Sequence, residues 1–212
     1  LFVLCTIILL SLSCNFVTDL FSSEPDHYFY VWSEDGDGVI DCDGEWVIEP
    51  DEDHTFASFM AEGLIPVHDF DEGTVYYMNK DGEQAFNKIF DSGYMFIGGY
   101  AAVEVDGKWG YIDTSGDYII RPTYDVYSVG DFGNGLVNVP EDKDAVDYAD
   151  SIIFIDKDGE EVLGPYRWAS SFLNGYAAVS ESRGDDYEDT YSGFINPNGE
   201  FVLEFDFESQ LG

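Results

Sequence analysis

Short runs of aromatic and β-branched residues alternate with polar turns along most of this chain. The segment 111–120 is representative, because two such runs flank a polar turn that contains Gly116. This pattern predicts a β-hairpin with a loop of three to four residues, in which the glycine takes the positive φ that other residues resist. An apolar period of 3.6 residues is not evident beyond the N-terminus, so we expect an all-β fold.

The hairpin pattern recurs about every forty residues. Its turn glycines are separated by 38, 34, 43 and 40 residues, at Gly44, Gly82, Gly116, Gly159 and Gly199. Each turn opens with an Asp or an Asn, such as Asp113, whose side chain can accept a hydrogen bond from the backbone two residues further on and so close the turn. Prolines follow the second strand of three hairpins, where we expect them to end the pairing: Pro50, Pro122 and Pro165.

A second motif shares this period. A phenylalanine precedes a glycine in four places, with Phe59, Phe96, Phe132 and Phe172 ahead of Gly63, Gly99, Gly135 and Gly175. Two motifs with one period indicate tandem repeats, each a meander of about three short strands. We expect an open, solenoid-like array, since units of this length are short for a four-stranded propeller blade; a closed ring of five units is the alternative.

The run from Lys108 through Trp109, Gly110 and Asp113 to Gly116 resembles the WG-repeat family, which is named for its Trp-Gly pair. The resemblance covers roughly residues 28–207, although the pair itself stands in only one unit. It implies a non-catalytic array, frequent in bacterial proteins and often attached to the cell envelope, in which these residues and the repeated glycines are structural. We place the array at 28–212, with units at 28–67, 68–105, 106–139, 140–180 and 181–212.

The N-terminal residues predict export. Residues 1–14 form a short apolar run that ends in small residues and Cys14, which suits a signal peptide better than a membrane-spanning helix. The end of this run resembles a bacterial lipobox, which implies a lipid on Cys14 and a tether over residues 15–27. Cleaved secretion and an uncleaved anchor helix through Phe21 are the alternatives. Since Cys5 would then be removed, Cys42 would be alone, and we expect no internal disulfide.

The chain is strongly acidic, with 44 Asp and Glu against 8 Lys and Arg and a net charge of −36. Such a charge repels nucleic acids and anionic bilayers, so we expect no nucleic-acid partner, and membrane contact only through the N-terminal lipid or anchor. Two acidic inserts, 141–150 and 181–190, precede equivalent hairpins and are expected to project from the same edge of the array.

Candidate chemical sites are few. Asp35, Asp37 and Asp41 have the alternate spacing of calcium ligands, but Ser33 occupies the first position of such a loop and Gly44 the twelfth, where a bidentate Glu is needed. We therefore expect no bound metal and no cofactor. The sequence contains no nucleophile elbow and no phosphate loop.

These features predict a non-enzymatic repeat protein of the bacterial cell envelope that binds a protein or glycan partner at the cell surface. The alternative is a secreted hydrolase that acts on cell-wall polysaccharide through a pair of acidic residues, because 44 acids place many pairs at suitable distances. Residues 205–209 match residues 124–128 but are followed by no Phe-Gly strand. We infer that the C-terminus is a cap, or that an N-terminal strand closes the last unit.

Overall fold

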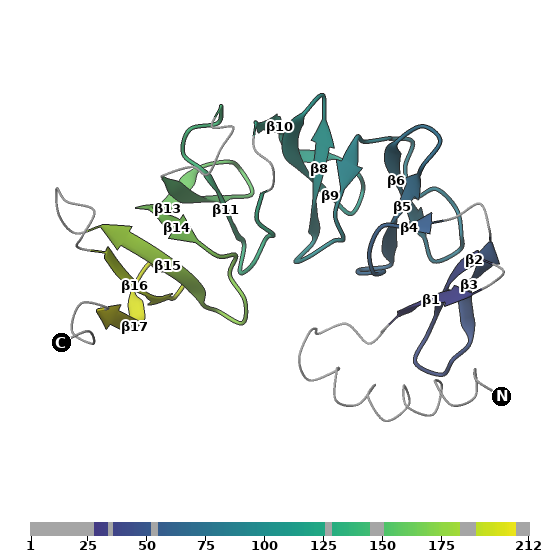
Figure 1. The fold of residues 1–212 in the computed structure, drawn as a ribbon, viewed down its shortest axis with the longest axis horizontal. Coiled ribbons are helices and arrows are strands. Elements are labelled where there is room, and N and C mark those ends of the chain that lie inside the picture. Colours follow the sequence, from purple (N-terminus) through teal and green to yellow (C-terminus); the bar gives the residue numbers. More distant parts are fainter. Residues whose placement is uncertain are drawn as a thin grey trace. The chain divides into compact units, whose positions relative to one another are not determined.

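A computed structural model describes residues 28–33, 36–51, 55–125, 129–144, 151–182 and 190–206. These residues form 17 strands and no helix, and the strands make five antiparallel sheets of three or four strands (Figure 1). The prediction of an all-β fold built from short meanders is confirmed. Within the described ranges no helix is long and apolar enough to cross a membrane. The chain divides into two compact units, residues 1–96 and 97–212.

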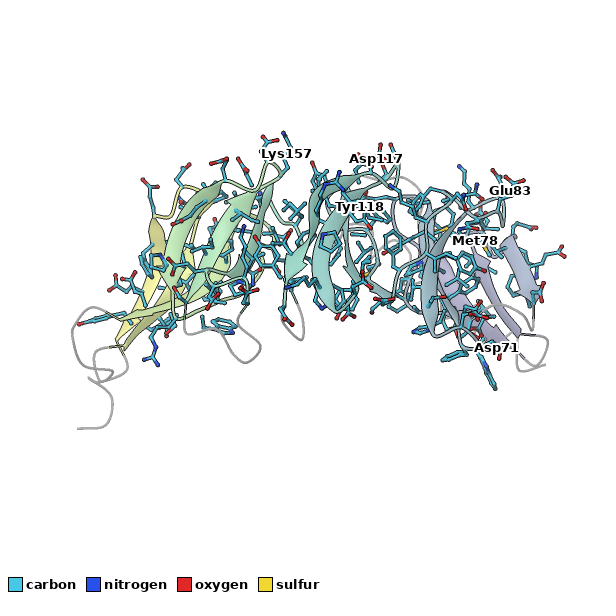
Figure 2. All side chains as sticks on the ribbon, turned by 90° about the horizontal axis from the view of Figure 1, so that it is seen from above. Asp71, Met78, Glu83, Asp117, Tyr118 and Lys157 are labelled. Carbon is cyan, nitrogen blue, oxygen red and sulfur yellow. The ribbon has the colours of Figure 1, made fainter. Side chains whose placement is uncertain are left out.

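The first unit contains two three-stranded sheets. Their strands are β1 (Phe29–Ser33), β2 (Gly36–Ile40), β3 (Trp46–Asp51), β4 (Thr55–Phe56), β5 (Leu64–Asp69) and β6 (Thr74–Asn79), followed by the short β7 (Ser92–Gly93). Residues of both sheets share one core, in which Val39, Ile65 and Val67 are at most 1% exposed. Figure 2 shows Met78 among the strands, while the exposed Asp71 and Glu83 lie in the turns that flank β6.

The second unit also consists of short antiparallel sheets, and within each sheet a strand pairs with its neighbours along the chain. Its strands are β8 (Tyr100–Val105), β9 (Lys108–Asp113), β10 (Tyr118–Tyr124), β11 (Leu136–Pro140), β12 (Ile152–Asp156), β13 (Glu161–Tyr166), β14 (Trp168–Ala169), β15 (Ala177–Ser182), β16 (Thr190–Ile195) and β17 (Phe201–Asp206). One core cluster lies between the β8–β10 sheet and the β11–β13 sheet, and a second lies between the β11–β13 sheet and the β14–β17 sheet. Each sheet therefore packs against the next one in the sequence.

The hairpin turns have one conformation throughout. Asp113 Oδ1 accepts hydrogen bonds from the backbone N–H groups of Ser115 (2.9 Å) and Asp117 (3.0 Å). Gly116 has a φ of +79° and donates its N–H to the Asp113 carbonyl oxygen at 2.8 Å. The same two side-chain bonds, at 2.9–3.1 Å, form at Asp41, Asn79, Asp156 and Asn196. The predicted turn is confirmed at all five positions.

The Trp-Gly pair has a packing role. A Cβ atom on Gly110 would lie 2.5 Å from the Pro122 nitrogen and 2.6 Å from the Ile120 oxygen, so the backbone of β10 leaves room only for glycine. Trp109 is 3% exposed and belongs to the core. The fourth hairpin carries Ile153 in place of this glycine, and its neighbouring strand has a glycine instead, at Gly164. A Cβ there would lie 3.0 Å from the Ile153 Cα.

The expectation that proline ends each hairpin is wrong. The three prolines lie inside β3, β10 and β13, and each falls at a shift of register. In the third hairpin, pairing skips from Ile120 to Tyr124, which pairs with Trp109. Proline has no N–H for the ladder, and a bulge is a place where that missing donor is tolerated. The strand therefore continues past the proline.

The second motif forms a two-residue turn. Asn134 and Gly135 have φ values of 53° and 80°, and Gly133 and Leu136 exchange backbone hydrogen bonds around them. The phenylalanine before the turn is buried at Phe96, Phe132 and Phe172, but Phe59 is 61% exposed. Met60, which lies three residues before Gly63, takes the buried position before this first turn. The assignment of Phe59 to this role is wrong by one residue.

Cys42 is disulfide-bonded, so the expectation of an unpaired Cys42 is wrong. The expectation rested on assigning the other two cysteines to processing at the N-terminus. Both Cys5 and Cys14 lie outside the described residues.

Candidate functional site

Two of the three weak calcium candidates, Asp37 and Asp41, have structural roles. Asp37 is 5% exposed, and its Oδ2 accepts a hydrogen bond from the Phe56 N–H at 3.3 Å. Burial, and after it a hydrogen bond to Asp37, raises the pKa of Tyr30. Asp41 closes its hairpin turn, and Asp35 lies outside the described residues. In the described ranges, no three His, Cys, Asp or Glu side chains are placed to hold a metal ion.

Exposed lysines of the second unit lie beside acidic side chains. Lys108 Nζ lies 3.9 Å from Asp125 Oδ2 and 3.6 Å from Asp144 Oδ1, and Lys157 Nζ lies 2.8 Å from Asp158 Oδ1. These side chains are largely exposed, so each pair contributes little to stability. Figure 2 shows Asp117 and Lys157 at turns on the same edge of the second unit. Most of both acidic inserts lies outside the described residues.

Tryptophan is the side chain whose placement departs most from the repeat pattern. Trp109 is buried, whereas Trp32, Trp46 and Trp168 are 74%, 46% and 55% exposed. The chain has four tryptophans, so most of its indole surface lies outside the core. Trp32 belongs to β1, and Trp46 packs across Gly38, where a Cβ would lie 2.6 Å from the indole Cζ3. Exposed indole rings are common anchors for a binding partner.

Interior faces of the repeats are covered by the phenylalanine of the following turn. The ring of Phe132 lies 5.1 Å from Tyr111, edge to face, and 4.5 Å from Tyr100. The ring of Phe172 covers Phe154 in the next junction, with the ring centroids 4.9 Å apart and the rings tilted at 54°. Tyr111 is 1% exposed, and its hydroxyl donates a hydrogen bond to the Gly130 oxygen at 2.8 Å.

The first unit repeats this contact between Tyr77 and Phe96, at 5.2 Å. The Tyr77 hydroxyl donates to the Tyr94 oxygen at 2.6 Å, and burial raises the pKa of Tyr77 well above its usual value. Each of these faces is therefore both dry and specifically covered.

The last sheet has the same kind of face, but it is open to solvent. The strand register places eight side chains together on this face: Trp168, Tyr176, Ala178, Ser180, Ser192, Phe194, Leu203 and Phe205. Phe194 corresponds to Tyr111 and Phe154, yet it is 42% exposed, and Leu203 is 50% exposed. We call this set the terminal face.

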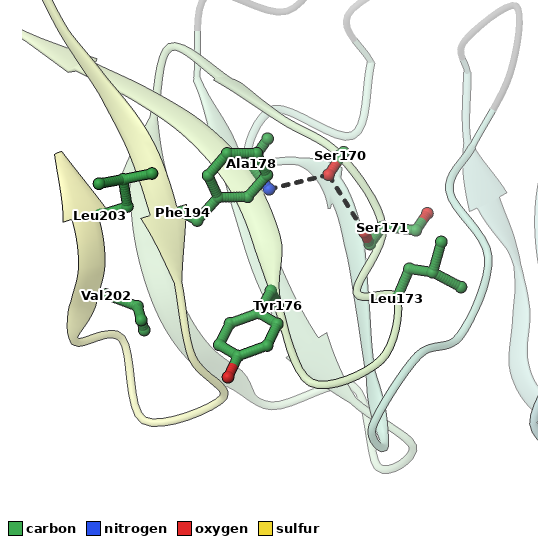
Figure 3. A pocket seen from close by; sticks show the side chains of 8 residues that line it. All are labelled: Ser170, Ser171, Leu173, Tyr176, Ala178, Phe194, Val202 and Leu203. Carbon is green, nitrogen blue, oxygen red and sulfur yellow. Dashed lines mark hydrogen bonds between the residues drawn. The ribbon is translucent and has the colours of Figure 1, made fainter. Parts of the chain in front are cut away.

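A hollow of about 470 Å³ lies at the terminal face, and both Tyr176 and Phe194 line it (Figure 3). Ser170 and Ser171 stand at its side, where Ser170 Oγ accepts a hydrogen bond from the Ala178 N–H at 3.0 Å and donates one to the Ser171 oxygen at 3.1 Å. The lining is otherwise apolar and carries no charged side chain.

A polar network supports the turn before this hollow. Ser171 Oγ donates to Asn138 Oδ1 at 3.0 Å and accepts from the Asp131 N–H at 2.9 Å, while Asn138 Nδ2 donates to the Ala169 oxygen at 3.1 Å. Partial burial raises the pKa of Asp131. These bonds hold successive repeats of the second unit together.

The geometry defines an all-β protein of tandem meanders, in which the repeated Asp, Asn and Gly residues form the turns and the Trp-Gly pair packs in the core. The sequence matches the family described as WG containing repeat at residues 77–109, 109–139, 154–182 and 193–209, which together hold just over half of the chain. The chain belongs to this family. Comparison with the curated proteins finds no significant match.

Solved structures show likeness in fold alone. A structure of a eukaryotic initiation factor aligns with a TM-score of 0.51 and 12% identity, over 87% of this chain and 53% of that one. Kluyveromyces lactis Hsv2 aligns with a TM-score of 0.49 and 11% identity, over 83% and 59%, and AztD from Citrobacter koseri with 0.40 and 13%, over 84% and 55%. The chain thus spans a little more than half the length of these structures.

Sequence reasoning missed both exposed surfaces. Trp32, Trp46 and Trp168 do not occupy the repeat position of Trp109. This difference in position was the sequence signal that they do not belong to the core. The terminal face looks like an interior face in sequence, because its exposure depends on what covers it.

Proposed function

We propose that this chain is a non-enzymatic WG-repeat protein of the bacterial cell envelope whose repeat surface binds a protein or glycan partner. The observation that carries this proposal is the exposure of Trp32 and Trp46 on the first sheet. A solvent-exposed indole offers a flat apolar ring with a polar N–H, on which a sugar ring or an apolar side chain can stack. Tryptophan is also enriched among the residues that dominate binding energy.

The charge of the chain restricts the partner. At −36, the protein repels polyanions and favours neutral or cationic surfaces. A neutral glycan or a basic protein segment meets this condition, and a nucleic acid does not.

The absence of catalysis is part of the proposal. The Asp and Asn side chains that recur in the hairpin turns accept hydrogen bonds from backbone N–H groups of the turns, which leaves them poorly placed to act as acids or bases. We expect no turnover of cell-wall polysaccharide by the purified protein.

Binding is tested with a tryptophan variant and a matched control. Trp32→Ala removes a 74% exposed ring, and Phe70→Ala removes a 72% exposed ring from the same unit. The full chain is titrated by fluorescence against purified peptidoglycan sacculi and, separately, against solubilised envelope proteins. We expect Trp32→Ala to raise the dissociation constant by at least about tenfold, while Phe70→Ala binds as the wild type does. Equal retention of both variants, or no retention of folded wild type by either probe, contradicts the proposal.

Anchoring is tested separately, on the protein expressed from its complete gene in a bacterium. A diacylglycerol-sized mass increment and membrane fractionation, both lost in Cys14→Ser, would identify a lipoprotein. In that form Cys42 would have no disulfide partner, because Cys5 is removed and Cys14 carries the lipid. An unmodified product that stays soluble would make the protein a secreted binder.

A further inference from the structure

One carboxylate of the first unit is buried without a positively charged partner. Among the residues that the structure describes, Asp37 is the only buried charged side chain, at 5% exposed. Its Oδ2 accepts a hydrogen bond from the Phe56 N–H at 3.3 Å, and the Tyr30 hydroxyl donates a second. Both donors are neutral, and no Lys, Arg or His of the described ranges forms an ion pair with Asp37. Buried charges are normally paired, and a carboxylate has room for about four hydrogen bonds, so Asp37 can still accept a cation.

An exposed indole lies beside this carboxylate. Trp32 is directly opposite Asp37 in the β1–β2 pair, and Asp51 is opposite Asp37 in the β2–β3 pair. Residues opposite each other in an antiparallel pair point to the same face, so these three side chains form a row across the first sheet, on strands about 4.8 Å apart. Trp32 is 74% exposed, whereas Val39, on the same face, belongs to the core. The row therefore marks the place where this face leaves the core and meets solvent.

The second sheet of the unit adds negative charge next to this row. Tyr76, on β6, packs against the core that the two sheets share. Burial raises the pKa of Tyr76, and the negative charges of Asp69 and then Asp51 raise it further. The two carboxylates therefore act on one hydroxyl, which means that Asp51 lies on the side of the first sheet that faces the second.

The first unit has little positive charge of its own to balance these groups. Of the eight Lys and Arg residues of the chain, only Lys80 and Lys88 precede residue 97. Both follow β6 in the sequence, and neither forms an ion pair with Asp37. The described part of the unit therefore supplies no cation to Asp37, and a partner could supply one.

We propose that Trp32, Asp37 and Asp51 form a recognition site for an arginine or lysine side chain of a basic protein segment. A cation over the indole face is attracted by the ring, and its N–H groups can donate to the carboxylates beside the ring. Arginine suits the site better than lysine, because its planar group can stack on the indole while it donates two hydrogen bonds to one carboxylate. This inference rests on the proposed partner-binding role of Trp32 and narrows the partner to a protein with exposed basic side chains.

The test is a titration of the full chain with two short peptides. One is acetyl-Gly-Arg-Gly-amide, and the other has citrulline in place of arginine, which keeps the shape of the side chain and removes its charge. The NMR signal of the Trp32 indole N–H, identified by its loss in Trp32→Phe, reports binding at the site, and about 150 mM NaCl screens the long-range charge of the chain. We expect a dissociation constant on the order of 1–10 mM for the arginine peptide, and binding at least about tenfold weaker for the citrulline peptide.

Two substitutions with the same change in net charge separate the site from the overall field of the protein. Asp37→Asn keeps an oxygen for the Phe56 N–H and should weaken binding of the arginine peptide by at least about tenfold. Asp71→Asn removes one charge from an exposed turn of the same unit, beside the exposed Phe70, and should bind as the wild type does. Circular dichroism verifies that both fold. If Asp37→Asn does not fold, Asp51→Asn, at an exposed position, takes its place and should weaken binding by at least about threefold.

Three results would overturn the proposal: equal binding of the two peptides, a Trp32 signal that does not move, or equal losses in Asp37→Asn and Asp71→Asn. The retention experiment with Trp32→Ala separates this failure from failure of the proposed function. Retention of envelope material that depends on Trp32, without selective binding of the arginine peptide, supports the partner-binding role and removes this inference. Selective binding of the arginine peptide, without retention of any envelope material, removes the proposed function instead.

Discussion

The side chain of Asp113 offers a sharp test of how the repeats are held, because one oxygen closes its turn. Replacing Asp113 with Ala removes two hydrogen bonds, to the N–H groups of Ser115 and Asp117, at 2.9 and 3.0 Å. Each such bond contributes a net 0.5–1.5 kcal/mol, roughly, and this turn is exposed to water, which takes up part of the loss. We expect Asp113→Ala to lower the free energy of unfolding by about 1–2 kcal/mol, as for the loss of a comparable helix cap.

The chain supplies its own control for this substitution. Asn79 and Asn196 make the same two bonds in their turns, so Asp113→Asn should stay within about 0.5 kcal/mol of the wild type. Urea denaturation gives the overall change, and hydrogen exchange at Ser115 and Asp117 reports the turn itself. Exchange at both amides should accelerate in Asp113→Ala alone. If Asp113→Asn loses as much as Asp113→Ala, or if exchange is unchanged in Asp113→Ala, the turn is not held by these bonds.

Four further substitutions test the core and its ionisable groups. Phe132→Ala, at a 2% exposed site, should lower the free energy of unfolding by about 3–5 kcal/mol in urea denaturation. Phe59→Ala, at a 61% exposed site, should lower it by less than about 0.5 kcal/mol. Similar losses for the two variants would mean that Phe59 is buried before its turn as Phe132 is. Burial raises the pKa of Tyr77 above the ordinary 10.0, so the stability that its neutral phenol provides is complete below pH 10 and falls as the pH rises beyond it; Tyr77→Phe should flatten this alkaline loss in a pH series of unfolding measurements. Burial also raises the pKa of Asp131, which means that its ionised form is disfavoured in the folded protein at neutral pH. Asp131→Asn should therefore unfold at higher urea than the wild type at pH 7, and the difference should shrink as the pH falls towards 3.8.

Much of the fold could be predicted because its determinants are local. The turn at Asp113 needs only a short acceptor and a glycine three residues later, and both are visible in sequence at all five places. The period of the turns then gives the meander. Features that depend on the space between strands could not be predicted. In the fourth hairpin the glycine that gives this space is Gly164, on the strand that pairs with the one carrying Ile153. Pro122 lies in a bulge whose position only the strand register shows.

The candidate site could be predicted much less well. Phe59 and Met60 are adjacent apolar residues, and the choice of which one is buried depends on a turn that starts at Ala61. Phe194 has the sequence neighbourhood of a core residue, and only its tertiary surroundings leave it exposed. The net charge is different, because it is a sum over the chain and follows directly from composition.

Within each described sheet, strands pair only with their neighbours along the chain, and this order also bears on how such a protein changes length over generations. Since no strand in the described sheets crosses over another, a duplicated stretch of about forty codons would insert one more sheet without rethreading those already present. The phenylalanine turn of the inserted copy would find an aromatic seat on the sheet before it, and would in turn offer a seat to the sheet after it. Gain or loss of a unit is therefore a small step for this gene, while a change within a unit, such as a side chain at Gly110, is a large one.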